Sequence, residues 1–263
     1  MIFLNNKQVV VKKFPNGESL IETSDFELRD ENEIMLKFQD DSDIASLLFL
    51  KGYIDDNNKR ASLTIPYMPY SRMDRTEGLT VFTLKYLCKL INSMNFQSVT
   101  IYEPHSDVSV ALLDRVKVVN MSAIIAKDVI ENLKQDNLYI VYPDAGAEKR
   151  YTKQIKYDKI LTCSKERDFK TGLIKKLEIN GTVSEKTFDA IIIDDLCSKG
   201  GTFTLTAEKL KKMGANNIYL VVTHCEDNIF KGEILNTDII NRIYTTNSII
   251  SKEHEKIQIR NIF

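Results

Sequence analysis

The chain has 263 residues, of which 43% are hydrophobic and 28% are charged. This hydrophobic content is enough to bury a sizeable core, which excludes a globally disordered protein. The 36 basic residues nearly balance the 37 acidic ones, so no overall charge draws the protein to nucleic acid or to an anionic membrane. The first residues lack the apolar stretch of a secretion signal, and no apolar run approaches membrane-spanning length. We therefore expect a soluble, cytoplasmic protein with no nucleic-acid or membrane partner.

Short β-rich runs alternate with helical patterns along the chain, which predicts βαβ units and an α/β fold with mainly parallel sheets. In the first half, strands are expected at residues 9–13, 19–23, 34–38, 62–65 and 98–102, and helices from residue 41 or 42 and over residues 80–94. In the second half, strands are expected at residues 138–142, 159–162, 188–193 and 218–222, and helices at residues 123–133 and 202–213. Gly214 is expected to end the last helix. The symmetry of the pattern predicts two domains, residues 1–120 and 121–263.

The four cysteines are far apart in the sequence and form no Cys-x-x-Cys pair. This spacing indicates reduced thiols rather than a zinc site or a disulfide framework. Cys197 lies close to an acidic pair, where carboxylates disfavour the thiolate form. A buried packing role is therefore favoured over a nucleophilic one.

The segment after the predicted strand 188–193 carries the strongest chemical signal. Asp194 and Asp195 follow an apolar run, at the sheet edge where parallel strands bind ligands. A Gly-rich turn and the start of a helix come next, at residues 198–202, and their backbone N–H groups favour a phosphate. The combination predicts a sugar-phosphate site in preference to an acidic strand end with an ordinary glycine turn.

Five segments resemble motifs of the ribose-phosphate pyrophosphokinases (PRPP synthetases), which have a type I phosphoribosyltransferase fold. Residues 14–18 resemble the Phe-x-Asp/Asn-x-Glu hairpin of that family, and residues 69–75 resemble its Pro-Tyr-Ala-Arg-Gln-Asp-Arg/Lys signature. Residues 142–147 resemble its Ser-Pro-Asp-Ala-Gly-Gly run, residues 164–167 the Lys-x-Arg of its mobile catalytic loop, and residues 193–202 its ribose-phosphate loop. The segments occur in family order, so the chain is identified as a short, divergent member.

The resemblance implies two similar phosphoribosyltransferase-like domains, each with a mainly parallel sheet flanked by helices, and an active site between them. The implied enzyme is a Mg²⁺-dependent diphosphokinase, which transfers the β,γ-diphosphate of ATP to the C1 hydroxyl of ribose 5-phosphate and yields PRPP and AMP. ATP and a ribose phosphate are the implied partners. A homo-oligomer, dimer or hexamer, is implied as well.

The roles of individual residues follow from the same resemblance. The implied catalytic cations are Lys165 and Arg167, which suit a reaction that accumulates charge on phosphoryl oxygens. The implied ATP-binding residues are Phe14, Asn16, Glu18, Arg72, Asp74, Arg75 and His105, the first three from a neighbouring subunit. The implied ribose-phosphate residues are Asp144, Asp194, Asp195, Ser198, Lys199, Gly200, Gly201 and Thr202. The implied Mg²⁺ ligands are His105 and Asp144, of which the carboxylate is the more typical.

Departures from the family pattern leave alternatives open. Ser198 and Lys199 stand where the family has Asp-Thr, so the phosphate turn loses an acid and gains a cation. One alternative is therefore the same chemistry on a larger ribose 5-phosphate ester such as ADP-ribose, in NAD salvage. A second alternative is a non-catalytic regulatory subunit, against which Asp144, Lys165 and Arg167 argue. Shortened segments at residues 38–44 and 75–83 predict that regulation by phosphate and ADP is lost.

Overall fold

The structure is a computed structural model that describes residues 1–76, 78–167 and 174–263. The chain forms two compact units, one of residues 1–119 with residue 263 and one of residues 120–262. Each unit contains a mainly parallel sheet with helices packed against it, so the predicted α/β class is confirmed. Within the described residues, we find no helix that combines the length and the apolar character needed to span a bilayer.

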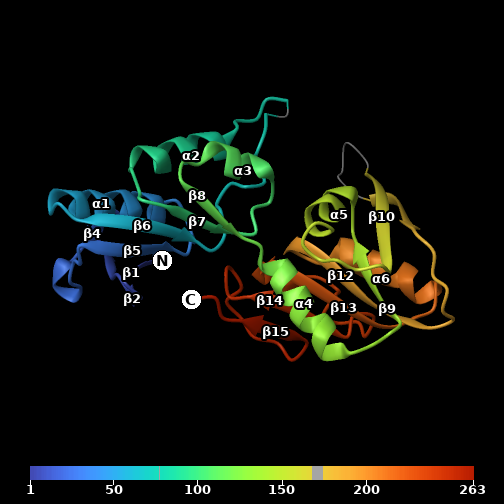
Figure 1. Cartoon of the computed structure of the whole chain (residues 1–263). Coiled ribbons are helices and arrows are strands. Elements are labelled where there is room, and N and C mark those ends of the chain that lie inside the picture. Colours follow the sequence, from blue (N-terminus) through green and yellow to red (C-terminus); the bar gives the residue numbers. More distant parts are fainter. Residues whose placement is uncertain (77, 168–173) are drawn as a thin grey trace. The chain divides into compact units, whose positions relative to one another are not determined.

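The first unit is built on the sheet β2-β1-β5-β6-β7-β8, with the helices seen in Figure 1. Its strands are β1 (Ile2–Leu4), β2 (Lys7–Gln8), β5 (Glu31–Leu36), β6 (Arg60–Ile65), β7 (Val99–Tyr102) and β8 (Val116–Val119), and β3 (Val11–Lys13) pairs with β4 (Ser19–Ile21) in a separate hairpin. Its helices are α1 (Ser42–Asp56), α2 (Thr83–Ser93) and α3 (Asp107–Leu112), with a short 3-10 helix, η1 (Thr23–Asp25). Strands β5 to β8 are parallel, whereas β1 pairs antiparallel with β2 and β5.

Strand β5 begins three residues earlier than the hydropathy pattern predicts, because a polar residue fills a core position. Asn32 is buried, and its Nδ2 donates to the carbonyl oxygens of Arg29 at 2.7 Å and Arg60 at 3.1 Å. These bonds join the start of β5 to the start of β6. A polar residue satisfied in this way is invisible to a pattern that counts only apolar side chains.

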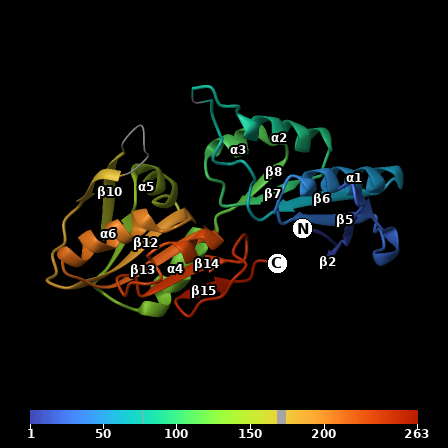
Figure 2. The same cartoon turned by 180° about the vertical axis from the view of Figure 1, so that it is seen from behind.

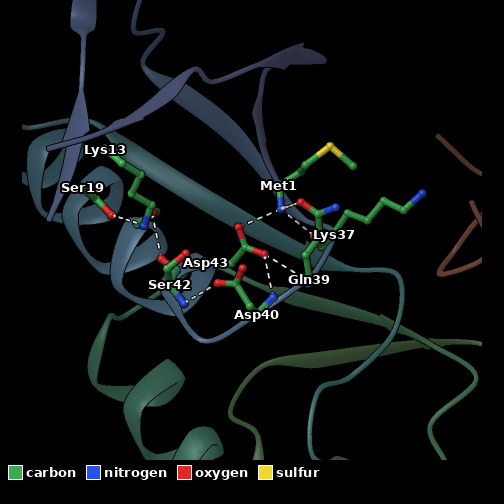
Figure 3. A network of polar contacts seen from close by, with 9 residues as sticks. Met1, Lys13, Ser19, Lys37, Gln39, Asp40, Ser42 and Asp43 are labelled. Carbon is green, nitrogen blue, oxygen red and sulfur yellow. Dashed lines mark hydrogen bonds and ion pairs between the residues drawn. The ribbon is translucent and has the colours of Figure 1, made fainter. Parts of the chain in front are cut away.

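The start of α1 is tied to β1 by a polar network (Figure 3). The α-ammonium group of Met1 donates to Asp43 Oδ1 at 2.8 Å. The N-cap residue is Asp41, as predicted among two choices, but its side chain makes no capping bond in the structure. Asp40 replaces it, accepting the backbone N–H of Ser42 at 2.8 Å. Hydrogen bonds from Ser42 also lower the pKa of the Asp40 carboxyl.

The second unit is built on the sheet β11-β10-β9-β12-β13-β14-β15. Its strands are β9 (Leu138–Tyr142), β10 (Ile160–Arg167), β11 (Ile174–Asn180), β12 (Phe188–Cys197), β13 (Ala215–Cys225), β14 (Arg242–Thr246) and β15 (Ile257–Arg260). Its helices are α4 (Met121–Leu133), α5 (Ala145–Tyr151) and α6 (Gly201–Lys212), with a 3-10 helix, η2 (Asp227–Lys231). Helices α4 and α6 cover opposite faces of the sheet, as Figure 1 and Figure 2 show from the two sides. Strand β9 is buried along its whole length, as expected when helices cover both faces.

Two strands of this unit are longer than their apolar runs predict. Strand β12 was expected to end at residue 193, but it pairs with β13 as far as Cys197 and Cys225, so the two aspartates lie within the strand. Strand β10 was expected to end at residue 162, but it continues to Arg167 because β11 pairs with it antiparallel. Gly214 follows α6 with a φ of 102°, which confirms the predicted helix end.

Candidate active site

The candidate site of the second unit lies at the carboxyl ends of neighbouring strands β10, β9, β12 and β13. Strand β10 follows β9 in the sequence and lies on one side of it in the sheet. Strand β12 lies on the other side of β9, and β13 lies beyond β12. The sheet order therefore reverses between β9 and β12, and open α/β sheets bind ligands at such a point. Asp144 follows β9, while Asp194 and Asp195 lie near the end of β12. The predicted carboxylates thus gather around the reversal point.

Asp144 precedes helix α5 and accepts two hydrogen bonds that fix its carboxylate. The backbone N–H of Ala147 donates to Oδ1 at 3.0 Å and caps the helix. Lys165 Nζ donates to Oδ2 at 2.6 Å from strand β10. Burial by itself would raise the pKa of Asp144, but these two donors hold the pKa below its ordinary value. Asp144 is therefore an ionised carboxylate paired with a cation.

Asp194 and Asp195 form a close acidic pair. The backbone N–H of Asp195 donates to Asp194 Oδ1 at 2.9 Å. Burial, and then the negative charge of Asp195, raise the pKa of Asp194 well above its ordinary value, and Asp144 adds to this effect. The pair suits a ligand that offers hydroxyl donors or a cation, because either would stabilise the ionised form.

Arg150 is a site residue that the sequence analysis missed. It lies on α5, and its Nη1 is 3.7 Å from Asp195 Oδ2. The guanidinium thereby offsets part of the negative charge of the acidic pair. A signal was available, because Arg150 follows the 142–147 motif by about one helical turn. The seven-residue helix that presents it was not predicted.

The turn at residues 198–202 has a closed side and an open side. Gly200 has a φ of 83°, and a Cβ there would lie 2.8 Å from the Ile234 side chain. A Cβ on Gly201, the first residue of α6, would meet nothing within 4 Å. The open space in front of the helix start is therefore where an anion would be accommodated.

The side chains of the turn differ in their surroundings. Ser198 Oγ donates to Glu226 Oε2 at 2.5 Å, a contact that the sequence analysis did not anticipate. Lys199 is exposed, while its carbonyl oxygen packs against Gly232, where a Cβ would lie only 2.0 Å away. Thr202 belongs to the first turn of α6. The backbone of the turn is thus held from behind by residues 226–234.

In the first unit, the predicted ATP-binding hairpin is an exposed turn between β3 and β4. The backbone N–H of Phe14 donates to the Glu18 carbonyl at 2.9 Å, and Gly17 takes a φ of 89° to close the turn. Asn16 Nδ2 donates to Glu18 Oε2 at 2.8 Å. Phe14 is 49% exposed, so apolar surface of this residue is available to a ligand or to another subunit.

A second group of predicted ATP-binding residues surrounds Asp74. Arg75 donates to this buried carboxylate through both Nε at 2.7 Å and Nη2 at 3.3 Å. The bond from Arg75 lowers the pKa of Asp74, and the charge of His105 contributes to the same shift. The structure therefore brings Asp74, Arg75 and His105 together. Arg72 lies nearby in sequence and is exposed.

The predicted catalytic loop is partly a strand. Lys165 lies in β10, and Arg167 is the last residue of that strand. The side chain of Arg167 and residues 168–173, which were expected to form a closing lid, lie outside the described residues. Lys165 is thus positioned by the β10–β11 pairing rather than by a loop.

The donor chemistry at Asp144 fits Mg²⁺. Among the residues that the structure describes, no cluster of three or more His, Cys, Asp or Glu side chains forms a ready-made metal site. Mg²⁺ in nucleotide-binding enzymes is usually held by one or two carboxylates together with substrate phosphates and waters. An ionised, partly exposed carboxylate such as Asp144 meets that requirement.

All four cysteines are free and buried. Cys197 and Cys225 are register partners on β12 and β13. The neighbouring Cys225 thiol, and then burial, raise the pKa of Cys197 well above its ordinary value. This supports the packing role over the nucleophilic one.

The fold and the strand-end site define an α/β protein with a candidate ligand site at the carboxyl ends of its parallel strands. Residues 157–262 match the family model described as "Phosphoribosyl synthetase-associated domain". A ribose-phosphate pyrophosphokinase of Sulfurisphaera tokodaii is 28% identical over 254 residues, which cover 90% of this chain and 83% of the relative. One from Agrobacterium fabrum is 28% identical over 222 residues, covering 81% of this chain and 70% of the relative. The crystal structure of phosphoribosylpyrophosphate synthetase from Mycobacterium smegmatis aligns with a TM-score of 0.76 at 16% identity, covering 97% of this chain and 86% of that one. The chain is thus similar in sequence to ribose-phosphate pyrophosphokinases, and it shares the fold of a phosphoribosylpyrophosphate synthetase.

Proposed function

We propose that the protein is a Mg²⁺-dependent diphosphokinase that transfers the β,γ-diphosphate of ATP to the C1 hydroxyl of ribose 5-phosphate, giving PRPP and AMP. The observation that carries the proposal is the grouping of the Asp144–Lys165 pair, the Asp194–Asp195 pair and the open glycine turn around one reversal point. These features provide a cation, hydroxyl acceptors and an anion site within one sheet edge. The curated relatives described above are named for the same activity.

The acceptor binds through the end of β12 and the turn that follows it. Asp194 and Asp195 accept hydrogen bonds from ribose hydroxyls, and Arg150 keeps part of their charge balanced. The backbone N–H groups of residues 200–202 hold the 5-phosphate at the start of α6. The sugar is thereby oriented with its C1 hydroxyl directed at the diphosphoryl group, which is the main task of a phosphoryl-transfer site.

Lys165 and Arg167 offset the charge that develops on the transferred group. Asp144 would hold Mg²⁺, and His105 is the other residue proposed as a ligand. When bound, Mg²⁺ supplies positive charge to the phosphate oxygens of ATP. Lys165, which is hydrogen bonded to Asp144 in the structure, would lie beside that metal and contribute positive charge to the diphosphoryl group.

ATP binds through residues of the first unit, namely Arg72, Asp74, Arg75 and His105, and through Phe14, Asn16 and Glu18 of a neighbouring subunit. The exposure of the Phe14 hairpin supports a role in another subunit's site. The protein is accordingly proposed to be a cytoplasmic homo-oligomer, a dimer or a hexamer.

A larger acceptor, such as ADP-ribose, is the second candidate. The observation that favours it is the Ser198–Glu226 hydrogen bond, which places a carboxylate beside the turn that receives the 5-phosphate. A doubly charged phosphomonoester is repelled by that carboxylate more than a phosphodiester is.

The test is an assay with ATP labelled at the γ-phosphate, Mg²⁺ and a panel of ribose phosphates. Label on the sugar together with stoichiometric AMP is expected. Formation of ADP would instead indicate an ordinary kinase. An absence of transfer to every acceptor would overturn the proposal in favour of a non-catalytic subunit. Asp194→Asn, which removes a proposed hydroxyl acceptor, is the matched inactive control.

A further inference from the structure

Glu226 lies directly behind the phosphate turn, in a position fixed by strand pairing. Its backbone N–H donates to the Cys197 carbonyl at 2.8 Å, which joins the end of β13 to the end of β12. Its Oε2 accepts the Ser198 hydroxyl at 2.5 Å and Asn228 Nδ2 at 3.2 Å. Two hydrogen bonds therefore hold the carboxylate at the turn, and a third bond fixes the backbone of the same residue.

This arrangement changes what the turn offers to a phosphate. A serine hydroxyl has one hydrogen to donate, and Ser198 gives it to Glu226, so the hydroxyl presents only lone pairs to a bound anion. The carboxylate itself adds a negative charge at the turn. A phosphate monoester carries between about 1.5 and 2 negative charges near neutral pH, whereas a diester carries one. The electrostatic cost of binding is therefore greater for the monoester.

We infer that Glu226 is a specificity-determining residue of the acceptor site. It favours the binding of acceptors whose 5-phosphate is esterified and therefore carries a single negative charge. The inference rests on the proposed function, because it assigns the acceptor to the turn at residues 198–202. Glu226 acts through Ser198 and through its charge, and it does not touch the reacting atoms.

The test compares ribose 5-phosphate with its methyl phosphodiester, which differs from it in charge and by one methyl group, and neither compound carries a nucleoside. Glu226→Gln keeps the shape of the side chain and removes the charge. The ratio of the two KM values is expected to shift toward the monoester by about tenfold, with kcat for each acceptor nearly unchanged. Equal changes in both KM values would mean a merely structural role and would overturn the inference.

Asp227→Asn is the matched control, because it removes a negative charge from the adjacent residue, whose Oδ1 accepts the backbone N–H of Ser251 at 2.9 Å instead. Its KM ratio is expected to equal that of the unsubstituted protein, and a shift as large as that of Glu226→Gln would overturn the inference. Glu226→Ala provides a second neutral variant if Glu226→Gln does not fold. If the unsubstituted protein binds and uses neither acceptor, both the proposed function and this inference fail. If it uses both and neither Glu226 variant shifts the ratio, only the inference fails.

Discussion

Lys165 Nζ lies 2.6 Å from Asp144 Oδ2, so the proposed catalytic cation is paired with the proposed Mg²⁺ ligand. The pairing joins the ends of β9 and β10, which are parallel neighbours in the sheet. It neutralises both groups in a partly buried position, where either one alone would be costly. The proposed catalytic cation and the proposed metal ligand are therefore direct neighbours at this sheet edge.

We predict that Lys165→Ala lowers kcat by about 10²- to 10³-fold with little change in ATP affinity, and that Arg167→Ala acts in the same direction. The reason is that charge on the transferred group develops in the transition state, and interactions made only there raise kcat. Steady-state kinetics and equilibrium ATP binding provide the measurements. Lys176→Ala is a suitable control, because Lys176 lies on β11 of the same hairpin and pairs with Glu178. A defect confined to the KM for ATP would contradict the assignment.

The raised pKa of Asp194 predicts that its ionised carboxylate lowers the stability of the folded protein, although the proposed acceptor site needs that carboxylate. A carboxyl whose pKa is raised on folding binds protons more tightly in the folded state, so its favourable contribution is present at low pH and is lost as pH rises through the folded pKa. Asp194→Asn should therefore abolish acceptor use but raise the Tm above neutral pH, by about 2–4 °C for each kcal/mol of repulsion removed. Thermal unfolding at a series of pH values measures the effect, and the gain should grow with pH.

Asp189→Asn is the control on the same strand. Asp189 is also buried, but it accepts the backbone N–H of Asn217 at 2.9 Å and the side-chain amide of the same residue. Loss of the carboxylate there should lower the Tm, because satisfied donors lose their acceptor. A gain in Tm for Asp189→Asn as large as that for Asp194→Asn would show that the effect is not specific to the acidic pair.

The two glycines of the turn should respond differently to alanine. Gly200→Ala is expected to lower the free energy of unfolding by about 1–3 kcal/mol, because it forces a side chain into the left-handed region and against Ile234. Gly201→Ala meets no atom within 4 Å and should leave the Tm nearly unchanged, yet its methyl group would enter the space proposed for the 5-phosphate. Chemical unfolding and the acceptor KM separate the two effects. An unaltered acceptor KM in Gly201→Ala would argue against that phosphate position.

The proposed subunit-shared ATP site can be tested by mixing inactive variants. A Glu18→Ala protein and a Lys165→Ala protein should each be inactive, and mixing them should restore part of the activity, because some sites would receive both intact halves. Subunit exchange is verified by mass spectrometry of the mixed oligomer. If exchange occurs and activity does not return, the hairpin does not complete a neighbour's site.

The sequence by itself determined the α/β class and the chemistry of the strand-end aspartates, because both depend on local patterns: apolar runs, helical periodicity and a glycine turn after two acids. The longer strands and helices were predicted to within a few residues. Short elements such as β1, β2, α5 and β15 were missed, since two to seven residues carry too little periodicity to be distinguished from a loop.

Tertiary structure decided which strand ends meet. The order β10-β9-β12-β13 brings together Asp144, Lys165 and Asp194 from positions as far apart as 50 residues along the chain. Only pairing with β13 extends β12 past the aspartates and places Glu226 against Ser198. These contacts depend on hydrogen bonds between strands that are remote in sequence, and no local pattern encodes the partner of such a strand.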